Sequence, residues 1–233
     1  MDLTAKDAAR LLNVDENTIQ QWIANGTLPS YRIGDKTRLS RVELMEWAAA
    51  RKHAVVPGMF RANEAMPLAF VLSDAVRRGG VLRDLDSTDK LSALGAVCQA
   101  MPLPADIDRD ELNSILVARE SLCSTGIGNG IAIPHPRGPL VLSVTSPQVT
   151  VAFPKCPIEF GSLDGVPVHT MFVIVSTTVR IHLQLLSHLM FALSRDSFLN
   201  LLTARADRDA LVAELRRIEE DLLEREAGEG PQP

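Results

Sequence analysis

The first 53 residues place apolar side chains at the spacing of short helices. Thr4 and Asp7 resemble a weak capping box, and an apolar helix face follows them. Asp15 can cap a second helix through Asn25, which Gly26 then ends. The side chains predicted to point inward on these two helices are Ala8, Leu11, Leu12, Ile19, Trp22 and Ile23. Two short helices across a tight turn at 13–14 predict a helix-turn-helix.

A strand-like alternation replaces the helical spacing after the second helix. Residues 31–33 and 37–39 alternate around the polar stretch 34–36, which predicts a hairpin or wing. A last helix is predicted over 41–52. These elements together make a small winged helix-turn-helix domain.

Residues 54–66 lack a clear period and contain Pro57-Gly58, so we interpret them as a linker. The linker separates a helix-turn-helix domain at 1–53 from a larger domain at 67–226. The last residues, 228–233, are expected to be frayed.

The larger domain interleaves helical and strand patterns. Helices are predicted at 67–78, 88–101, 108–120, 181–194 and 207–226. Thr88 and Asp108 are the expected N-caps of two of them. Strands are predicted at 81–82, 140–144, 148–153 and 169–175. This order predicts an α/β fold, a mixed sheet flanked by helices.

Composition narrows the class of protein. The chain has 233 residues, 46% of them hydrophobic, which is enough for a sizeable core. It has no run of 18 apolar residues and no signal peptide at its start, so we expect a cytoplasmic protein without membrane contact. Cys98, Cys123 and Cys156 are odd in number and form no C-x-x-C motif, which favours reduced thiols over disulfides or a metal site.

Candidate chemistry concentrates at residues 124–137. Gly126, Gly128 and Gly130 alternate, which predicts positive φ angles or the close approach of another group. Pro134 and Pro136 hold His135 on a stiff, extended segment.

Two common nucleotide motifs are excluded for this glycine run. No lysine follows the glycines, as a P-loop requires, and the run leads into a strand where a dinucleotide motif leads into a helix. Free N–H groups beside a rigid imidazole suit a histidine that takes up a phosphoryl group. A glycine-rich turn with a structural histidine fits the same residues equally well.

A second histidine, His182, stands near the start of the helix predicted at 181–194. At about 100° per residue it shares the inward face with Leu186, Leu189 and Leu193. The residues alone favour a core histidine. His53 and His169 show no partner pattern, and we interpret them as incidental.

The run from Arg119 to His135, Arg-Glu-Ser-Leu-Cys-Ser-Thr-Gly-Ile-Gly-Asn-Gly-Ile-Ala-Ile-Pro-His, resembles the enzyme IIA proteins of the bacterial phosphotransferase system. It is similar to the fructose/mannitol class and its nitrogen-regulatory branch, over about residues 67–223. Cys123 stands where many members have a smaller residue, and Pro136 where many have glycine.

The resemblance implies roles for particular residues. His135 would accept phosphate from an HPr-type phosphocarrier protein, and His182 would be a second active-site histidine. Arg119 would pair with the phosphoryl group or the donor protein. Thr125 and the backbone N–H groups around Gly126, Gly128 and Gly130 are candidate donors to phosphate. No metal or organic cofactor is implied, and the chain is an enzyme component only if its acceptor is active.

The first domain resembles excisionase/MerR-type helix-turn-helix domains through Leu3-Thr4, residues 8–12, Thr18-Ile19, Trp22-Ile23 and Arg32-Ile33-Gly34. The resemblance implies that the second helix enters the major groove of DNA. Base edges would then be reached by Asn17, Thr18, Gln20 and Gln21. The phosphate backbone would be held by Arg32, Lys36, Arg38 and Arg41.

Charge limits the strength of this DNA contact. Residues 1–53 carry eight Lys/Arg and seven Asp/Glu, a net charge of about +1, so one copy should bind DNA weakly. A homodimer that reads two half-sites would bind more strongly. A repurposed protein-binding module is the alternative.

Three functions fit these observations. The chain is a regulator whose phosphorylation state controls DNA or protein binding, or a component that passes phosphate to a sugar-transport enzyme IIB, or a domain with a vestigial acceptor that only scaffolds a dimer. The helix-turn-helix, and the lack of a fused enzyme IIB or IIC segment, favour the regulator.

Overall fold

A computed structural model of the chain describes residues 2–33, 36–40, 43–44, 47–48, 72–105, 107–136, 146–162 and 164–228. The chain divides into two compact units, Met1–Glu64 and Ala65–Pro233. The predicted linker at 54–66, the strand predicted at 140–144, Arg41, His53 and the last five residues lie outside the described residues.

The first unit has the predicted helix-turn-helix with a hairpin. Its elements are β1 (Asp2–Leu3), α1 (Ala5–Leu12), α2 (Glu16–Ala24), β2 (Tyr31–Ile33) and β3 (Lys36–Ser40). Thr4 and Asp7 form a complete capping box on α1, and the Asp15 carboxylate caps α2. The antiparallel order β1-β3-β2 includes β1, which the sequence did not predict because a two-residue strand has no period.

A small apolar core holds this unit together. The Trp22 and Trp47 rings pack with centroids 4.8 Å apart, and the Trp47 indole donates a hydrogen bond to the Thr27 carbonyl. Ile19, Leu28 and Leu39 are fully or almost fully buried. The core therefore joins both helices to the hairpin.

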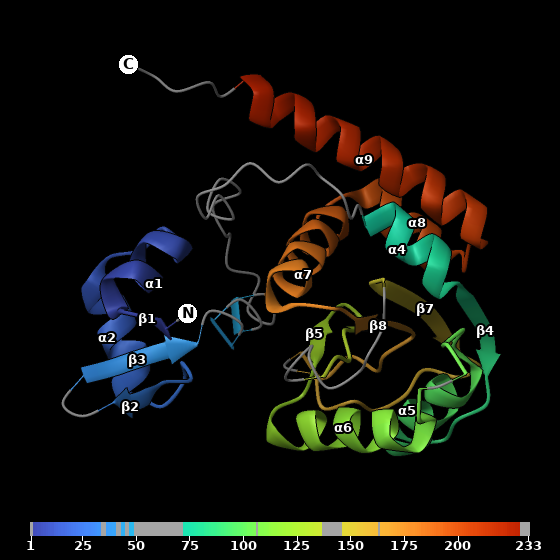
Figure 1. Cartoon of the computed structure of the whole chain (residues 1–233), viewed down its shortest axis with the longest axis horizontal. Coiled ribbons are helices and arrows are strands. Elements are labelled where there is room, and N and C mark those ends of the chain that lie inside the picture. The colour runs from blue at the N-terminus through green and yellow to red at the C-terminus, as the bar shows by residue number, and fades with distance from the viewer. Residues whose placement is uncertain are drawn as a thin grey trace. The chain divides into compact units, whose positions relative to one another are not determined.

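The second unit contains a mixed sheet with helices on both faces, as predicted (Figure 1). Its helices are α4 (Leu72–Gly79), α5 (Lys90–Ala100), α6 (Arg109–Leu122), α7 (Val179–Leu193), α8 (Asp196–Thr203) and α9 (Arg208–Gly228). Its strands are β4 (Val81–Leu85), β5 (Gly126–Gly128), β6 (Ile131–Ala132), β7 (Gln148–Pro154) and β8 (Thr170–Val175). Within the described residues the strand order is β4-β7-β8-β6-β5. The pairs β4·β7 and β6·β8 are parallel, whereas β5·β6 and β7·β8 are antiparallel.

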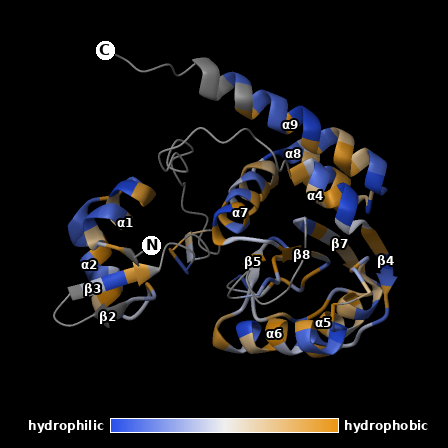
Figure 2. Ribbon diagram, viewed as in Figure 1, coloured by the Kyte–Doolittle hydropathy of each residue, from blue (hydrophilic) through white to orange (hydrophobic). Residues whose placement is uncertain are grey.

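The sheet separates two apolar cores. Val151 of β7 and Phe172 of β8 pack toward α4, α7, α8 and α9, whereas Ala152 and Met171 pack toward α5 and α6. Figure 1 shows these two helical layers, and Figure 2 shows apolar strands between helices whose outer faces are polar. Strands buried on both faces are continuously apolar, which explains why β7 and β8 were predicted from sequence.

Two predictions about helix ends are wrong. Asp89, and not Thr88, caps α5, because its carboxylate accepts from the Ser92 N–H while the Ser92 hydroxyl accepts from the Asp89 N–H. Asp108 caps α6 as predicted, but that helix continues two residues past Glu120.

Helix α8 was not predicted. It begins after Arg195 without a side-chain cap, so it lacks the usual start signal.

Candidate active site

His135 lies at the carboxyl end of an extended segment that continues β6. The Ile133 N–H donates to the Thr125 carbonyl (3.0 Å), and the Ile174 N–H donates to the Pro134 carbonyl (3.0 Å). Sheet pairing on both sides therefore fixes the backbone up to the residue before the histidine. The His135 side chain is only 2% exposed.

His182 reaches the same edge of the sheet from α7. The Thr178 side chain caps this helix, and the His182 N–H donates to the Thr178 carbonyl (3.0 Å), so His182 lies in the first turn. Because β6 and β8 are parallel, their carboxyl ends meet at one edge, where α/β folds commonly hold ligands. The two imidazole rings lie 4.9 Å apart, centroid to centroid, at 44°. The structure thus brings together the two histidines that the sequence singled out.

The His135 ring has a defined tautomer. Its Nδ1 lies 2.7 Å from the Ile133 carbonyl oxygen. A carbonyl only accepts hydrogen bonds, so Nδ1 carries the proton and the lone pair of the neutral ring is on Nε2. Nε2 is therefore the nitrogen suited to nucleophilic attack.

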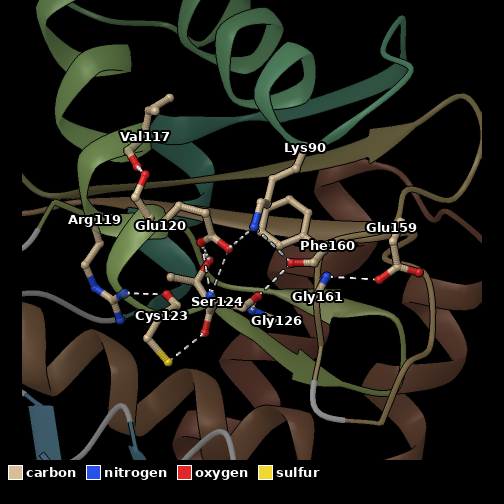
Figure 3. A network of polar contacts seen from close by, with 12 residues as sticks. Lys90, Val117, Arg119, Glu120, Cys123, Ser124, Gly126, Glu159, Phe160 and Gly161 are labelled. Atoms are coloured by element: carbon tan, nitrogen blue, oxygen red, sulfur yellow. Dashed lines mark hydrogen bonds and ion pairs between the residues drawn. The ribbon is translucent and has the colours of Figure 1, made fainter.

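Arg119 and Thr125, both predicted site residues, stabilise the chain beside His135. The Arg119 side chain is 8% exposed and donates from Nη1 to the Cys123 carbonyl (2.8 Å; Figure 3). The Thr125 N–H and hydroxyl both donate to the Glu120 carboxylate, at 3.0 and 2.6 Å. The hydroxyl hydrogen that the sequence assigned to a phosphate is thus bonded within the protein.

The three glycines meet protein side chains. A Cβ on Gly126 would lie 2.3 Å from Ser162 Oγ, and one on Gly130 would lie 2.3 Å from His169 Cδ2. Gly128 has φ +90°, and a Cβ there would lie 2.8 Å from an Asp164 carboxylate oxygen. The prediction of positive φ or close approach is therefore confirmed: Gly128 and Gly130 have positive φ, and all three glycines are closely approached, by Ser162, Asp164 and His169.

The glycine loop differs from the predicted phosphate cradle. The Gly126 N–H donates to Ser124 Oγ (3.1 Å), and the Asn129 N–H donates to the Asp164 carboxylate (2.7 Å). The turn between β5 and β6 lies at the opposite end of β6 from His135, and five extended residues span about 16 Å. Gly128 and Gly130 are therefore not gathered around the His135 ring.

The sequence interpretation missed an ion pair between a half-buried lysine and a buried glutamate beside this segment. Glu120, 4% exposed, lies 3.3 Å from Lys90 Nζ, which also donates to the Phe160 carbonyl (3.3 Å; Figure 3). The only sequence signal was a glutamate within the recognised motif. Nothing in the sequence marked Lys90, which is 30 residues away.

His169, which the sequence analysis interpreted as incidental, has a defined environment in the structure. Its Nδ1 lies 2.8 Å from Thr170 Oγ1, and burial lowers the pKa of its imidazole. A neutral His169 therefore packs against the glycine turn.

The predicted DNA-contacting residues differ in how they are placed. Asn17, Gln20 and Gln21 are exposed on α2. Thr18 is half-buried, and its N–H and hydroxyl donate to the Asp15 carboxylate at 2.9 and 2.7 Å, so it serves the helix cap. Arg38 is half-buried on β3. Arg32 and Lys36 lie on the hairpin strands, and Arg41 is outside the described residues.

None of the helices among the described residues is long and apolar enough to span a membrane.

Family models match both units of the chain. Residues 76–218 match the family "Phosphoenolpyruvate-dependent sugar phosphotransferase system, EIIA 2", and residues 3–52 match a helix-turn-helix domain family. The first match covers more than half of the chain.

Individual relatives agree with this assignment. The chain is 38% identical over 114 residues to a nitrogen regulatory protein of Pseudomonas aeruginosa, covering 48% of this chain and 71% of that protein. It is 36% identical over 107 residues to the fructose-specific EIIABC component of the phosphotransferase system of Bacillus subtilis. That match covers 45% of this chain but only 16% of the much longer relative.

Solved structures show the same fold. The nitrogen regulatory protein IIA-Ntr of Neisseria meningitidis is similar with a TM-score of 0.51 at 27% identity, covering 58% of this chain and 91% of that one. A IIA protein of Streptococcus mutans has the same TM-score at 16% identity, covering 65% and 96%. Family, sequence and fold agree, and the chain belongs to the EIIA 2 family of the phosphoenolpyruvate-dependent sugar phosphotransferase system, with a helix-turn-helix domain preceding the EIIA 2 domain.

Proposed function

We propose that His135 accepts a phosphoryl group on Nε2 from the phosphohistidine of an HPr-type carrier protein. The observation that carries this proposal is the contact between His135 and His182 at one sheet edge, with Nδ1 of His135 bonded to the Ile133 carbonyl. A structural histidine would not need a second, equally buried imidazole beside it.

The transfer needs no metal among its steps. The Nε2 lone pair of His135 forms a bond to phosphorus while the P–N bond of the carrier's phosphohistidine breaks. The carrier's phosphohistidine ring, protonated on its other nitrogen, takes back the electron pair and leaves as neutral imidazole. His135 keeps its Nδ1 proton, bonded to the Ile133 carbonyl, so proton and charge balance. Phosphoryl transfer passes through a loose transition state, so positioning and donation to the phosphoryl oxygens matter most. In our proposal His182 is such a donor, and Arg119 offers positive charge beside the site.

Labelling with a phosphorylated HPr-type carrier tests this proposal. We expect the full chain to acquire one acid-labile phosphoryl group, and His135→Ala to acquire none. His169→Ala is the matched control, because it removes a half-buried histidine of the same unit and should keep full labelling. Full labelling of His135→Ala would disprove the acceptor.

We further propose that the first unit binds DNA and makes the chain a transcriptional regulator. Support comes from the helix-turn-helix family match and from Asn17, Gln20 and Gln21, which are exposed on α2 as base-reading residues must be. The test selects DNA from a random pool with the wild-type chain and compares its affinity for two variants. We expect the double variant Asn17→Ala/Gln21→Ala to bind this DNA more weakly. The control Gln99→Ala, which changes an exposed glutamine on α5, should bind it as the wild type does. Equal binding by all three proteins would show that these α2 side chains do not read bases, and a failure to select any DNA would favour a protein-binding module.

A second candidate function is transfer of the phosphoryl group onward to a sugar-transport enzyme IIB. The Bacillus subtilis relative, a fructose-specific EIIABC component, favours it. A chase of the phosphorylated chain with purified enzyme IIB decides between the two functions. Rapid loss of label to enzyme IIB supports the transport component, and stable label supports the regulator.

A further inference from the structure

We infer that Lys90, Glu120 and Thr125 are positioning residues for His135 and fix which of its ring nitrogens carries the proton. The inference rests on the proposed function, because the tautomer matters for transfer only if His135 is the acceptor. Its basis is a series of hydrogen bonds that links an ion pair to the imidazole.

The series begins at the buried Glu120 carboxylate. Every group that bonds to it in the described structure is a donor: Lys90 Nζ at 3.3 Å, the Thr125 N–H at 3.0 Å and the Thr125 hydroxyl at 2.6 Å. Lys90 is itself held by the Phe160 carbonyl (3.3 Å), and Figure 3 shows its ammonium between Glu120 and Phe160. The carboxylate therefore ties the residue that precedes β5 to both α5 and α6.

The series continues through the backbone to the histidine. The Thr125 carbonyl accepts from the Ile133 N–H (3.0 Å), and the Ile133 carbonyl accepts from His135 Nδ1 (2.7 Å). Glu120 thus orients Thr125, and Thr125 orients the peptide unit whose neighbouring carbonyl selects the Nδ1–H tautomer. An orienting group of this kind decides whether an imidazole presents the correct nitrogen.

The same geometry argues against Thr125 as a donor to phosphate. A hydroxyl has one hydrogen, and that of Thr125 points to Glu120 at 2.6 Å, a short bond to a buried carboxylate. Thr125 therefore acts through His135 and not on the phosphoryl group.

Charge is required at Glu120 because its partners are all donors. Glutamine at this position would direct its NH₂ group at Lys90 or at Thr125, and either arrangement sets a donor against a donor. We expect Glu120→Gln to disturb the tautomer more than Thr125→Val does, since it weakens two links of the series.

The test is a nitrogen-15 NMR measurement of the His135 tautomer in the full, unphosphorylated chain, together with the transfer rate from the phosphorylated carrier. Thr125→Val removes the hydroxyl while keeping the shape. We expect it to raise the Nε2–H population of His135 and to slow transfer by about 10- to 100-fold, by analogy with the loss of residues that orient metal-ligating histidines. Thr125→Ser keeps the donor and should restore both values.

Thr150→Val is the matched control. Thr150 is fully buried on β7, and its hydroxyl donates to the Gly79 carbonyl (2.9 Å), outside the series that reaches His135. Thr150→Val should lower the free energy of unfolding about as much as Thr125→Val does. The tautomer of His135 and the rate of phosphoryl transfer should stay unchanged.

Two results would overturn the inference. One is an unchanged Nδ1–H tautomer in Thr125→Val, with or without slower transfer. The other is an equal tautomer shift in Thr150→Val, which would assign the effect to general destabilisation. The tautomer is read without any phosphoryl donor, so a failure of the proposed acceptor function would leave this measurement intact.

Discussion

At the scale of single residues, His135 and His182 are equally buried but are positioned by different means. His135 sits between two prolines and is bonded through Nδ1 to its own strand, whereas His182 depends on the first turn of a helix. In the proposed mechanism the first arrangement presents the nucleophile, and the second presents a side chain toward it. This difference leads to different expectations for their substitution.

His182→Ala should slow phosphoryl transfer without abolishing it. In the proposed mechanism His182 donates to a phosphoryl oxygen, and removal of one such donor typically costs about 10²-fold in rate. Single-turnover transfer from the phosphorylated carrier measures the effect, with His188→Ala as a control on the same helix. A wild-type rate for His182→Ala would reduce this residue to a core histidine.

The buried thiol of Cys98 should make the free energy of unfolding decrease as the pH rises above 9. Burial raises the pKa of its thiol to about 12 from an ordinary value of 9.0. Between these two pKa values the folded state keeps a thiol proton that the unfolded chain loses. The free energy of unfolding is therefore unaffected by this thiol below pH 9, and it falls as the pH rises from 9 toward 12. Denaturant titrations across this range should show a steeper decline for wild type than for Cys98→Ala, by up to about 1.4 kcal/mol per pH unit.

The exposed Cys156 supplies the control for that comparison. Cys156→Ala should keep the wild-type dependence on pH. Parallel curves for wild type and Cys98→Ala would show that the thiol does not ionise differently in the two states.

At the scale of elements, the β5–β6 hairpin is fixed by its contact with residues 162 and 164–169. Gly126, Gly128 and Gly130 each meet a different residue of that segment, namely Ser162, Asp164 and His169. The alternation of glycines along the chain is thus explained by three close approaches on a hairpin whose other end leads to His135.

Gly126→Ala should destabilise the fold by about 1–3 kcal/mol, the usual cost of overpacking. Its Cβ would lie 2.3 Å from Ser162 Oγ and 3.2 Å from Ser162 Cα. Gly95→Ala, in the interior of α5, should instead stabilise by about 0.5–1 kcal/mol, because the added Cβ would lie 4.0 Å from Asn113 Nδ2, at ordinary contact distance. Urea denaturation measures both changes, and Ser162→Ala should relieve part of the first. Wild-type stability in Gly126→Ala would show that the segment moves aside freely.

Elements with local signals were predictable from the sequence, and those without were not. Thr4, Asp15 and Asp108 mark helix starts because a capping side chain acts within three residues. Helix α8 has no such cap, and β1 is too short to show a period. The same contrast between local signals and tertiary contacts holds in the candidate site around His135. The prolines and glycines around His135 are its neighbours in sequence, whereas Lys90 meets Glu120 only through the packing of α5 against α6.

At the scale of the whole molecule, charge is unevenly divided. Residues 54–233 carry 16 Lys/Arg and 22 Asp/Glu, a net charge of −6, against about +1 for residues 1–53. Helix α2, the expected reading helix, has no lysine or arginine in residues 16–24. Non-specific attraction to DNA should therefore be weak, and the proposed DNA binding should depend on base contacts and on two copies of the chain.

Phosphorylation should weaken DNA binding at least several-fold. It adds a charge of about −1.5 to −2 near pH 7, by analogy with other phosphorylated side chains, to a unit that is already acidic. Direct repulsion reaches little beyond the Debye length of about 8 Å, so a more distant phosphohistidine would have to act through residues 54–66.

The measurement is a titration of selected DNA with the phosphorylated and unphosphorylated chains at two salt concentrations, with His135→Ala treated with the carrier as control. A ratio of affinities that shrinks at high salt indicates repulsion, and a constant ratio indicates a conformational route. Equal affinities of the two forms at both concentrations would mean that phosphorylation of His135 is not coupled to DNA binding by the first unit.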